Sequence, residues 1–304
     1  MRRRQGRNAQ VVRRAPLRRF TRFAVIDWSG ERVARPRGLA VAVAEAGVAA
    51  PVLVTPSAQR WSREGVLAWL VAQADEDMLI GLDLSPGLPF VDAGAYFPGW
   101  ADTPQTAKAL WQRVDEACSG SAYLSADGFL AHPAAREHFL QPTYRGEHYA
   151  PANGRLRRCE QRQDGLFPSS CMKLIGANQV GKSSLTGMRV LHRLGGRLPV
   201  WPFDPLPPAG ALIVEVYTTL AARTAGLPRG RSKMRTHDAL DAALTHGAIG
   251  SEPTGQTGPI DDHAGDAILT AAWLRRRAHD PRLWSPPRLA PAIAATEGWT
   301  FGVL

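Results

Sequence analysis

The chain has 304 residues, of which 44% are apolar, so it is long enough to bury a sizeable core. No apolar run reaches the roughly 18 residues that a membrane span needs, and no apolar signal sequence follows the basic N-terminus. Its three cysteines lack the paired spacing of a metal site, which indicates reduced thiols. These features predict a cytoplasmic protein that does not associate with membranes.

The formal net charge of +10 is concentrated in residues 1–22, which hold nine arginines and no acid. The rest of the chain is nearly balanced in charge. We expect residues 1–22 to form a disordered basic arm. Such an arm can bind nucleic acid by releasing counterions, and it can equally be a solvated tail without a partner.

The first strand is expected at residues 23–27, where four apolar residues run into Asp27 and the turn-forming Ser29 and Gly30 follow. A carboxylate at the end of a buried strand is costly to desolvate unless a partner, such as a divalent cation, pairs with it. The alternative is that Asp27 caps its own turn.

Three more strands and a helix are expected next, in the order strand, strand, helix and strand. This order predicts an antiparallel meander, followed by a helix that crosses over and places the fourth strand parallel to the first. Asp83 near the end of the fourth strand would then lie close to Asp27. The predicted ranges are 39–43, 51–55 and 78–84 for the strands and 63–74 for the helix.

Residues 88–170 are rich in proline, glycine, aromatic and basic residues and are expected to form an insertion that caps the substrate site. Short helices are predicted at 106–118 and 134–139. Arginines among aromatic residues can bind phosphates and stack on bases, although an ordinary solvated insertion has the same composition. The predicted substrate contacts in this region are Arg145, Arg157 and Arg158.

A phosphate-loop pattern follows, in which Gly176, Gly181, Lys182 and Ser183 match G-x-x-x-x-G-K-[ST]. The strand that should precede such a loop, at 172–175, is short and interrupted by a lysine, and no later strand carries the expected aspartate. We therefore interpret Lys182 as a substrate contact at the rim of the site. Nucleotide binding by Gly176–Ser183 remains the alternative.

The C-terminal part adds two further acidic positions. Glu215 lies within an expected strand at 211–217, and Asp262 and Asp266 share one face of a helix that runs to Arg277. A helix is also predicted at 235–249, and the terminal segment at 297–302 is expected to pack back on the fold. Acids in a first helical turn also favour the helix dipole, which is the alternative for Asp262.

Clustered carboxylates without a cysteine or histidine ligand set suit a hard cation, Mg²⁺ or Mn²⁺. Two such ions can activate water and stabilise the leaving oxygen of a phosphodiester. The predicted catalytic residues are Asp27, Asp83, Glu215 and Asp266. The predicted metal ligands are Asp27, Asp83, Asp266 and Asp262.

The order of these elements and acids resembles the ribonuclease H-like fold, and in particular an uncharacterised family of predicted RNase H-like nucleases. The resemblance implies one α/β domain over residues 23–304, with a mixed five-stranded sheet flanked by helices and a long insertion after strand four. It implies that Asp27, Asp83 and Asp266 hold metal, with Glu215 as a fourth acid. The matching segments are 23–30, 79–86, 176–181, 213–217, 237–242, 262–272 and 297–303.

Residues 262–267 also resemble the last-helix motif of junction-resolvase relatives, which adds His263 to the candidates. The helix at 63–74 departs from the classical pattern because its acids lie only near its two ends. The expected function is a metal-dependent nuclease acting on DNA or RNA. The alternatives are a nucleotide-binding phosphotransferase or NTPase of the actin and sugar-kinase kind, and a non-catalytic nucleic-acid-binding protein.

Overall fold

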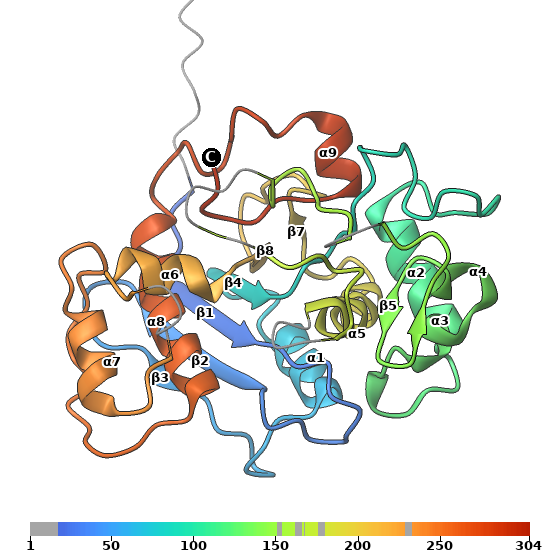
Figure 1. Cartoon of the computed structure of the whole chain (residues 1–304). Coiled ribbons are helices and arrows are strands. Elements are labelled where there is room, and N and C mark those ends of the chain that lie inside the picture. Colours follow the sequence, from blue (N-terminus) through green and yellow to red (C-terminus); the bar gives the residue numbers. More distant parts are fainter. Residues whose placement is uncertain (1–17, 151–153, 162–165, 167, 176–179, 229–232) are drawn as a thin grey trace, which may run out of the picture.

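The computed structural model describes residues 18–150, 154–161, 166, 168–175, 180–228 and 233–304. Its centre is a six-stranded mixed sheet in which β1 pairs antiparallel with β2, and β2 antiparallel with β3 (Figure 1). Strand β1 pairs parallel with β4, and β8 pairs parallel with both β4 and β7. In spatial order the strands are β3 (Val52–Leu53), β2 (Ala40–Glu45), β1 (Arg22–Asp27), β4 (Met78–Asp83), β8 (Leu212–Glu215) and β7 (Val200–Trp201).

The predicted α/β class, the antiparallel meander and the parallel fourth strand are confirmed. The sheet has six strands rather than the predicted five, because β7 adds an edge strand beside β8. Strand β7 covers only two residues and is followed by Pro202. A two-residue strand next to a proline is too short to produce an alternating pattern, which explains why the sequence did not predict it.

Helices cover both faces of the sheet, and alternate residues of each central strand enter different cores. Ile26 of β1 belongs to the core beneath α1 (Arg63–Ala72) and α5 (Val180–Arg193), whereas Val25 belongs to the core beneath α8 (Asp262–Arg277). The first face is covered by α1 and α5, and α2 (Ala107–Ala117) packs against α5. The second face is covered by α6 (Thr218–Thr224), α7 (His237–Leu244) and α8 (Figure 1).

The insertion after β4 forms a separate layer of short elements beside α5 (Figure 1). Helix α2 confirms the helix predicted at 106–118, whereas the one predicted at 134–139 is present only as α4. The unpredicted α3 precedes it, and a small two-stranded sheet of β5 and β6 follows. The bounds are η1 (Ala122–Leu124), α3 (Asp127–Ala131), α4 (Pro133–Arg136), β5 (Leu140–Gln141) and β6 (Tyr144–Arg145).

The folded region begins before residue 23, where the predicted arm was expected to end. Arg18 pairs with Asp77, and the ring of Phe20 is buried against Trp284. Arg22 already belongs to β1 and pairs with Glu45. Residues 18–22 are therefore part of the fold, and the predicted disorder of residues 1–17 concerns a segment outside the described residues.

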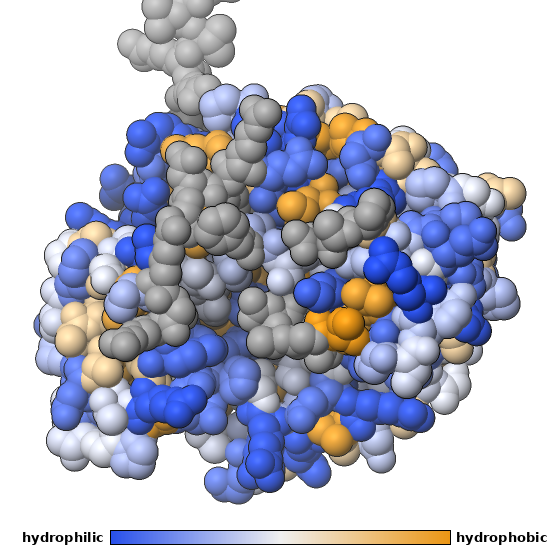
Figure 2. Space-filling model, viewed as in Figure 1, coloured by the Kyte–Doolittle hydropathy of each residue, from blue (hydrophilic) through white to orange (hydrophobic). Residues whose placement is uncertain are grey.

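The C-terminal segment packs back on the fold as predicted. It follows α9 (Pro291–Thr296), and Trp299 and Phe301 are fully buried in the core beneath α8. On the face shown in Figure 2, apolar residues occur in small groups among hydrophilic ones. Within the described ranges, no helix combines the length and apolarity needed to cross a membrane.

Candidate functional site

Asp27 and Asp83 lie side by side at the carboxyl ends of the two central parallel strands. They are direct register partners in the pairing of β1 with β4. Both point to the sheet face that α8 covers, because they continue the alternation of Phe23 and Leu79, which lie in the core beneath α8. The predicted neighbourhood of these two acids is confirmed, and it follows from the parallel crossover through α1.

Asp266 approaches the pair from the first turns of α8, which packs across β1 and β2. Its side chain is buried, as is that of Asp27, with 7% and 5% of their surfaces exposed. Burial raises the pKa of all three carboxyl groups above its usual value. The charges of Asp27 and Asp266 raise the pKa of Asp83 further, which places the three acids within electrostatic reach of one another.

Each of these acids has a polar partner in this structure. The Nδ1 atom of His263 lies 3.0 Å from Oδ2 of Asp27, and this hydrogen bond raises the pKa of the imidazole. The Nζ atom of Lys233 donates to Oδ2 of Asp266. Asp83 accepts a hydrogen bond of 3.3 Å from the hydroxyl of Thr218, at the start of α6. The residues that compensate the acids thus come from three different segments.

The donor chemistry of Asp27, Asp83 and Asp266 fits a hard divalent cation. Among the described residues, however, no group of three His, Cys, Asp or Glu side chains has the spacing of a metal site. The ammonium group of Lys233 supplies positive charge instead, because it bonds Asp266 and is also attracted by Asp27. Lys233 thus offsets part of the negative charge of the acids.

Asp262 lies one helical turn before Asp266, at the rim of this cluster. Its side chain is 28% exposed and faces Arg235, whose Nε atom is 3.6 Å from Oδ1. It attracts Lys233 electrostatically. The structure therefore places Asp262 beside the three-acid cluster, in the first turn of α8 where acids favour the helix dipole.

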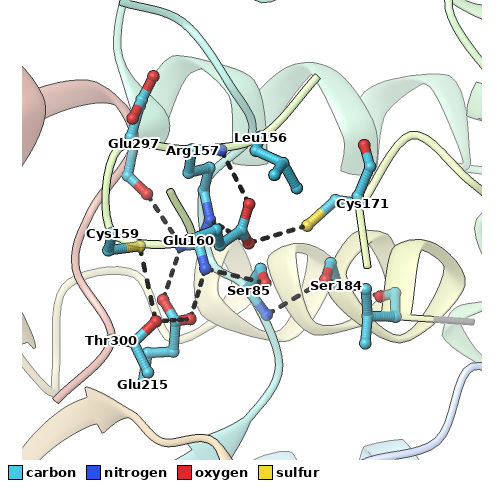
Figure 3. Close-up of polar contacts among 12 residues, drawn as sticks. Ser85, Leu156, Arg157, Cys159, Glu160, Cys171, Ser184, Glu215, Glu297 and Thr300 are labelled. Atoms are coloured by element: carbon cyan, nitrogen blue, oxygen red, sulfur yellow. Dashed lines mark hydrogen bonds and ion pairs between the residues drawn. The ribbon is translucent and has the colours of Figure 1, made fainter. Parts of the chain in front are cut away.

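Glu215 does not join the other acids, contrary to the prediction. It pairs in register with Leu82, one residue before Asp83, so its side chain points to the opposite face of the sheet. There its carboxylate receives two hydrogen bonds from Arg157, at 2.7 and 2.5 Å, and one of 2.7 Å from Thr300 (Figure 3). Val216, the residue that follows β8, lies on the face of the acids, and its apolar side chain cannot bind metal.

Arg157 is also placed differently from its prediction as a substrate contact. Its guanidinium is fully buried and donates to Glu160, to both oxygens of Glu215, to the hydroxyl of Ser85 and to the carbonyl of Glu297 (Figure 3). All five N–H groups of an arginine are thereby satisfied. Arg157 therefore holds segments of the fold together and does not face a substrate.

The other predicted substrate residues lie at the surface. Arg158 is exposed and bonds Gln161, while its backbone N–H donates to Glu297. The guanidinium of Arg145 lies 5.1 Å from the ring centre of Tyr149. Neither has a contact with the three-acid cluster. Their predicted role in substrate binding stays a prediction.

Lys182 lies in the first turn of α5 and lines a pocket that His263 also lines. Since His263 bonds Asp27, this pocket adjoins the acid cluster. Gly176, the first glycine of the phosphate-loop pattern, lies outside the described residues. Residues 172–175 before it are not a strand of the central sheet, because among the described residues Lys173 pairs with Leu140 of β5.

Three residues near the site were not predicted from the sequence. Lys233 and Thr218 contact the acids, and Arg63 donates to the carbonyls of Ser29 and Glu31 in the turn after β1. The arginine of α1 and the lysine after α6 carry no local pattern that points to a distant partner. Of the three residues, only Thr218 could have been predicted, because it is a threonine directly after an expected strand.

Comparisons with protein-family models, with curated proteins and with solved structures find no match to this chain.

Proposed function

We propose that the chain is a nuclease of the ribonuclease H-like fold that depends on a divalent cation, Mg²⁺ or Mn²⁺, and hydrolyses phosphodiester bonds of DNA or RNA. The observation that carries this proposal is the register pairing of Asp27 with Asp83, joined by Asp266 from α8. Burial raises the pKa of all three carboxyl groups, and the charges of Asp27 and Asp266 raise that of Asp83 further, so a bound cation would stabilise the site.

Within this proposal, Asp27, Asp83 and Asp266 hold the cation. A divalent cation bound there would polarise the phosphodiester and lower the pKa of a water molecule. The bond from Lys233 holds Asp266 in place and lowers its pKa, which counteracts the effect of burial, and His263 does the same for Asp27. Rigid strands carry two of the three ligands, which limits the movement needed on binding.

The test is cleavage of DNA and RNA substrates with Mg²⁺ or Mn²⁺ and with a chelator, comparing the native chain with Asp27→Asn. We expect Asp27→Asn to lose activity by about 100-fold or more, because a metal ligand acts directly on transition-state charge. Its circular dichroism spectrum should stay native. Asp238→Asn is the matched control, since Asp238 is exposed on α7. Equal activity in the three proteins would refute the assignment.

A second candidate is a nucleotide-dependent phosphotransferase, favoured by the contact between the turn after β1 and the start of α5. A Cβ atom on Gly30 would lie 2.5 Å from the backbone nitrogen of Ser183. Two small-residue turns that meet in this way are suited to phosphate binding. However, the segment before α5 lacks the central strand that a phosphate loop requires. Calorimetry with ATP and GTP distinguishes the candidates, because micromolar affinity for either favours the phosphotransferase.

A further inference from the structure

A pocket of about 570 Å³ adjoins the acid cluster on the side of the turn that follows β1. Its walls are the loop between β1 and β2, the segment around α3 and the first turns of α5. His263 lines it and bonds Asp27 through Nδ1, so the pocket and the acids share one side chain. Its volume lies in the range of small-molecule sites and suits one nucleotide unit.

Two buried arginines fix the walls of this pocket. Arg63 donates to the carbonyls of Ser29 and Glu31 on one wall and to that of Tyr123 on the insertion. Arg189 of α5 donates to the carbonyl of Ser125 at 2.6 Å on the other wall. Walls held by buried, charge-assisted hydrogen bonds keep their shape without a ligand, which reduces the entropy lost on binding.

Two walls of the pocket are in close backbone contact at Gly30, which has no side chain. A Cβ atom there would lie 2.6 Å from the carbonyl carbon of Lys182 and 2.5 Å from the nitrogen of Ser183, and backbone atoms cannot move aside cheaply. Only glycine therefore lets the turn after β1 lie directly against α5. This contact brings the polar groups of residues 182–183 next to the strand that ends in Asp27.

The charges that line the pocket favour an anion. Arg32 is neutralised by Asp127, whose Oδ2 lies 2.7 Å from its Nε. Within the part of the chain that the structure describes, the side chains of Arg37 and Lys182 have no hydrogen-bond or ion-pair partner. Two of the described residues that line the pocket are acids, Asp127, which is paired with Arg32, and Glu31. Glu31 therefore opposes Arg37 and Lys182, and its carboxylate accepts from the backbone N–H of Arg37.

We propose that this pocket binds the phosphate of a nucleotide unit through Lys182 and Arg37, with Ala126 and Leu130 offering apolar surface to the sugar or base. The inference rests on the proposed function. In that function, the bound nucleotide is part of the nucleic-acid substrate, and the neighbouring phosphodiester bond faces the acids. The same nucleoside-phosphate chemistry occurs in free nucleotides. The source is therefore decided by the experiment.

The experiment measures the fluorescence anisotropy of labelled single-stranded DNA and RNA oligonucleotides with the full chain in chelator, so that binding is separated from cleavage. Lys182→Gln and Arg37→Gln should each weaken binding about 10- to 100-fold and lower the slope of log K against log salt by about 0.7. Glu31→Gln should tighten binding, since it removes a repulsive charge. Arg276→Gln is the control, because Arg276 is exposed at the far end of α8.

Native thermal melting curves of all variants exclude loss of fold as the cause. Calorimetry with AMP and ATP forms the second arm. If these nucleotides bind in a way that depends on Lys182 and the oligonucleotides do not bind, the pocket is supported and its ligand is a free nucleotide. Equal losses in Lys182→Gln and Arg276→Gln overturn the inference, and so does a lack of binding by every probe. Cleavage with Mn²⁺ tests the acids separately. If the native chain cleaves and Lys182→Gln binds the oligonucleotides as tightly as the native chain, the pocket inference is refuted and the proposed nuclease function is not.

Discussion

At the scale of single residues, the role of an acid in a strand depends on its register, because the register decides which face of the sheet the side chain points to. Asp83 and Glu215 both end parallel strands of one sheet, but they differ by one position in register. One residue of offset turns a side chain from the face of α8 to the face of α5. The sequence identified both strands and both acids. It could not identify the register between strands that are more than a hundred residues apart.

The carboxyl group of Asp83 is expected to destabilise the fold at neutral pH. Burial and the charges of Asp27 and Asp266 raise its pKa, so the folded state binds its proton more tightly than the unfolded state does. Its unfavourable contribution is therefore absent below the unfolded pKa of about 4 and grows as the pH rises through the folded pKa.

Asp83→Asn should therefore raise the free energy of unfolding at pH 7 and leave it nearly unchanged at about pH 3.5. Urea unfolding of both proteins at the two pH values measures this difference. A loss of stability at pH 7 on substitution would mean that the charged carboxylate is held by favourable contacts, contrary to the electrostatic argument.

At the scale of elements, the buried cluster around Arg157 joins four parts of the chain. It connects the insertion, the turn after β4 at Ser85, strand β8 at Glu215 and the C-terminal segment at Thr300 (Figure 3). The sequence pointed to Arg157 because arginines among aromatic residues can bind phosphates, and to Glu215 because it is an acid within an expected strand. The ion pair between Arg157 and Glu215 explains why both charged residues are present, without any ligand.

Arg157→Ala should lower the free energy of unfolding by about 3–5 kcal/mol, because it leaves two buried carboxylates without their counter-charge. Arg158→Ala, at the exposed neighbouring position, should change it by less than about 1 kcal/mol. Denaturant unfolding of the two variants gives both values. Similar small effects would show that water or protonation compensates the buried acids.

At the scale of the whole molecule, the order of strands and helices in the sheet was readable from the sequence because each central strand is a short apolar run. The two-residue β7 and the helix α3 were not readable, since their few residues carry no periodic pattern. The boundary of the basic arm was set too late for a related reason. Arg18 and Arg22 look like parts of a charged tail, and only the structure shows their pairing with Asp77 and Glu45.

This boundary can be tested by two truncations. Removing residues 1–17 should leave the melting temperature unchanged, and if the arm binds nucleic acid it should lower the salt dependence of binding. Removing residues 1–22 should lower the melting temperature, because it deletes the buried Phe20 and the first residue of β1. Calorimetry and anisotropy titrations over a salt series measure both effects. Complete loss of binding and of cleavage after the shorter truncation would favour a protein that binds through its arm alone.

The placement of Thr300 and Glu297 in the Arg157 cluster also has a consequence for how the chain folds during synthesis. Arg157, Glu160 and Glu215 leave the ribosome well before the residues that complete their hydrogen bonds. Until then, the end of β8 lacks the neighbour at Thr300 that flanks it in the finished sheet. The nascent chain therefore carries the central strands without their last covering segment. The C-terminal segment therefore packs onto the fold late. A chain whose translation stops before this segment would expose the carboxylates of the Arg157 cluster, and the core that Trp299 covers, to solvent and to chaperones.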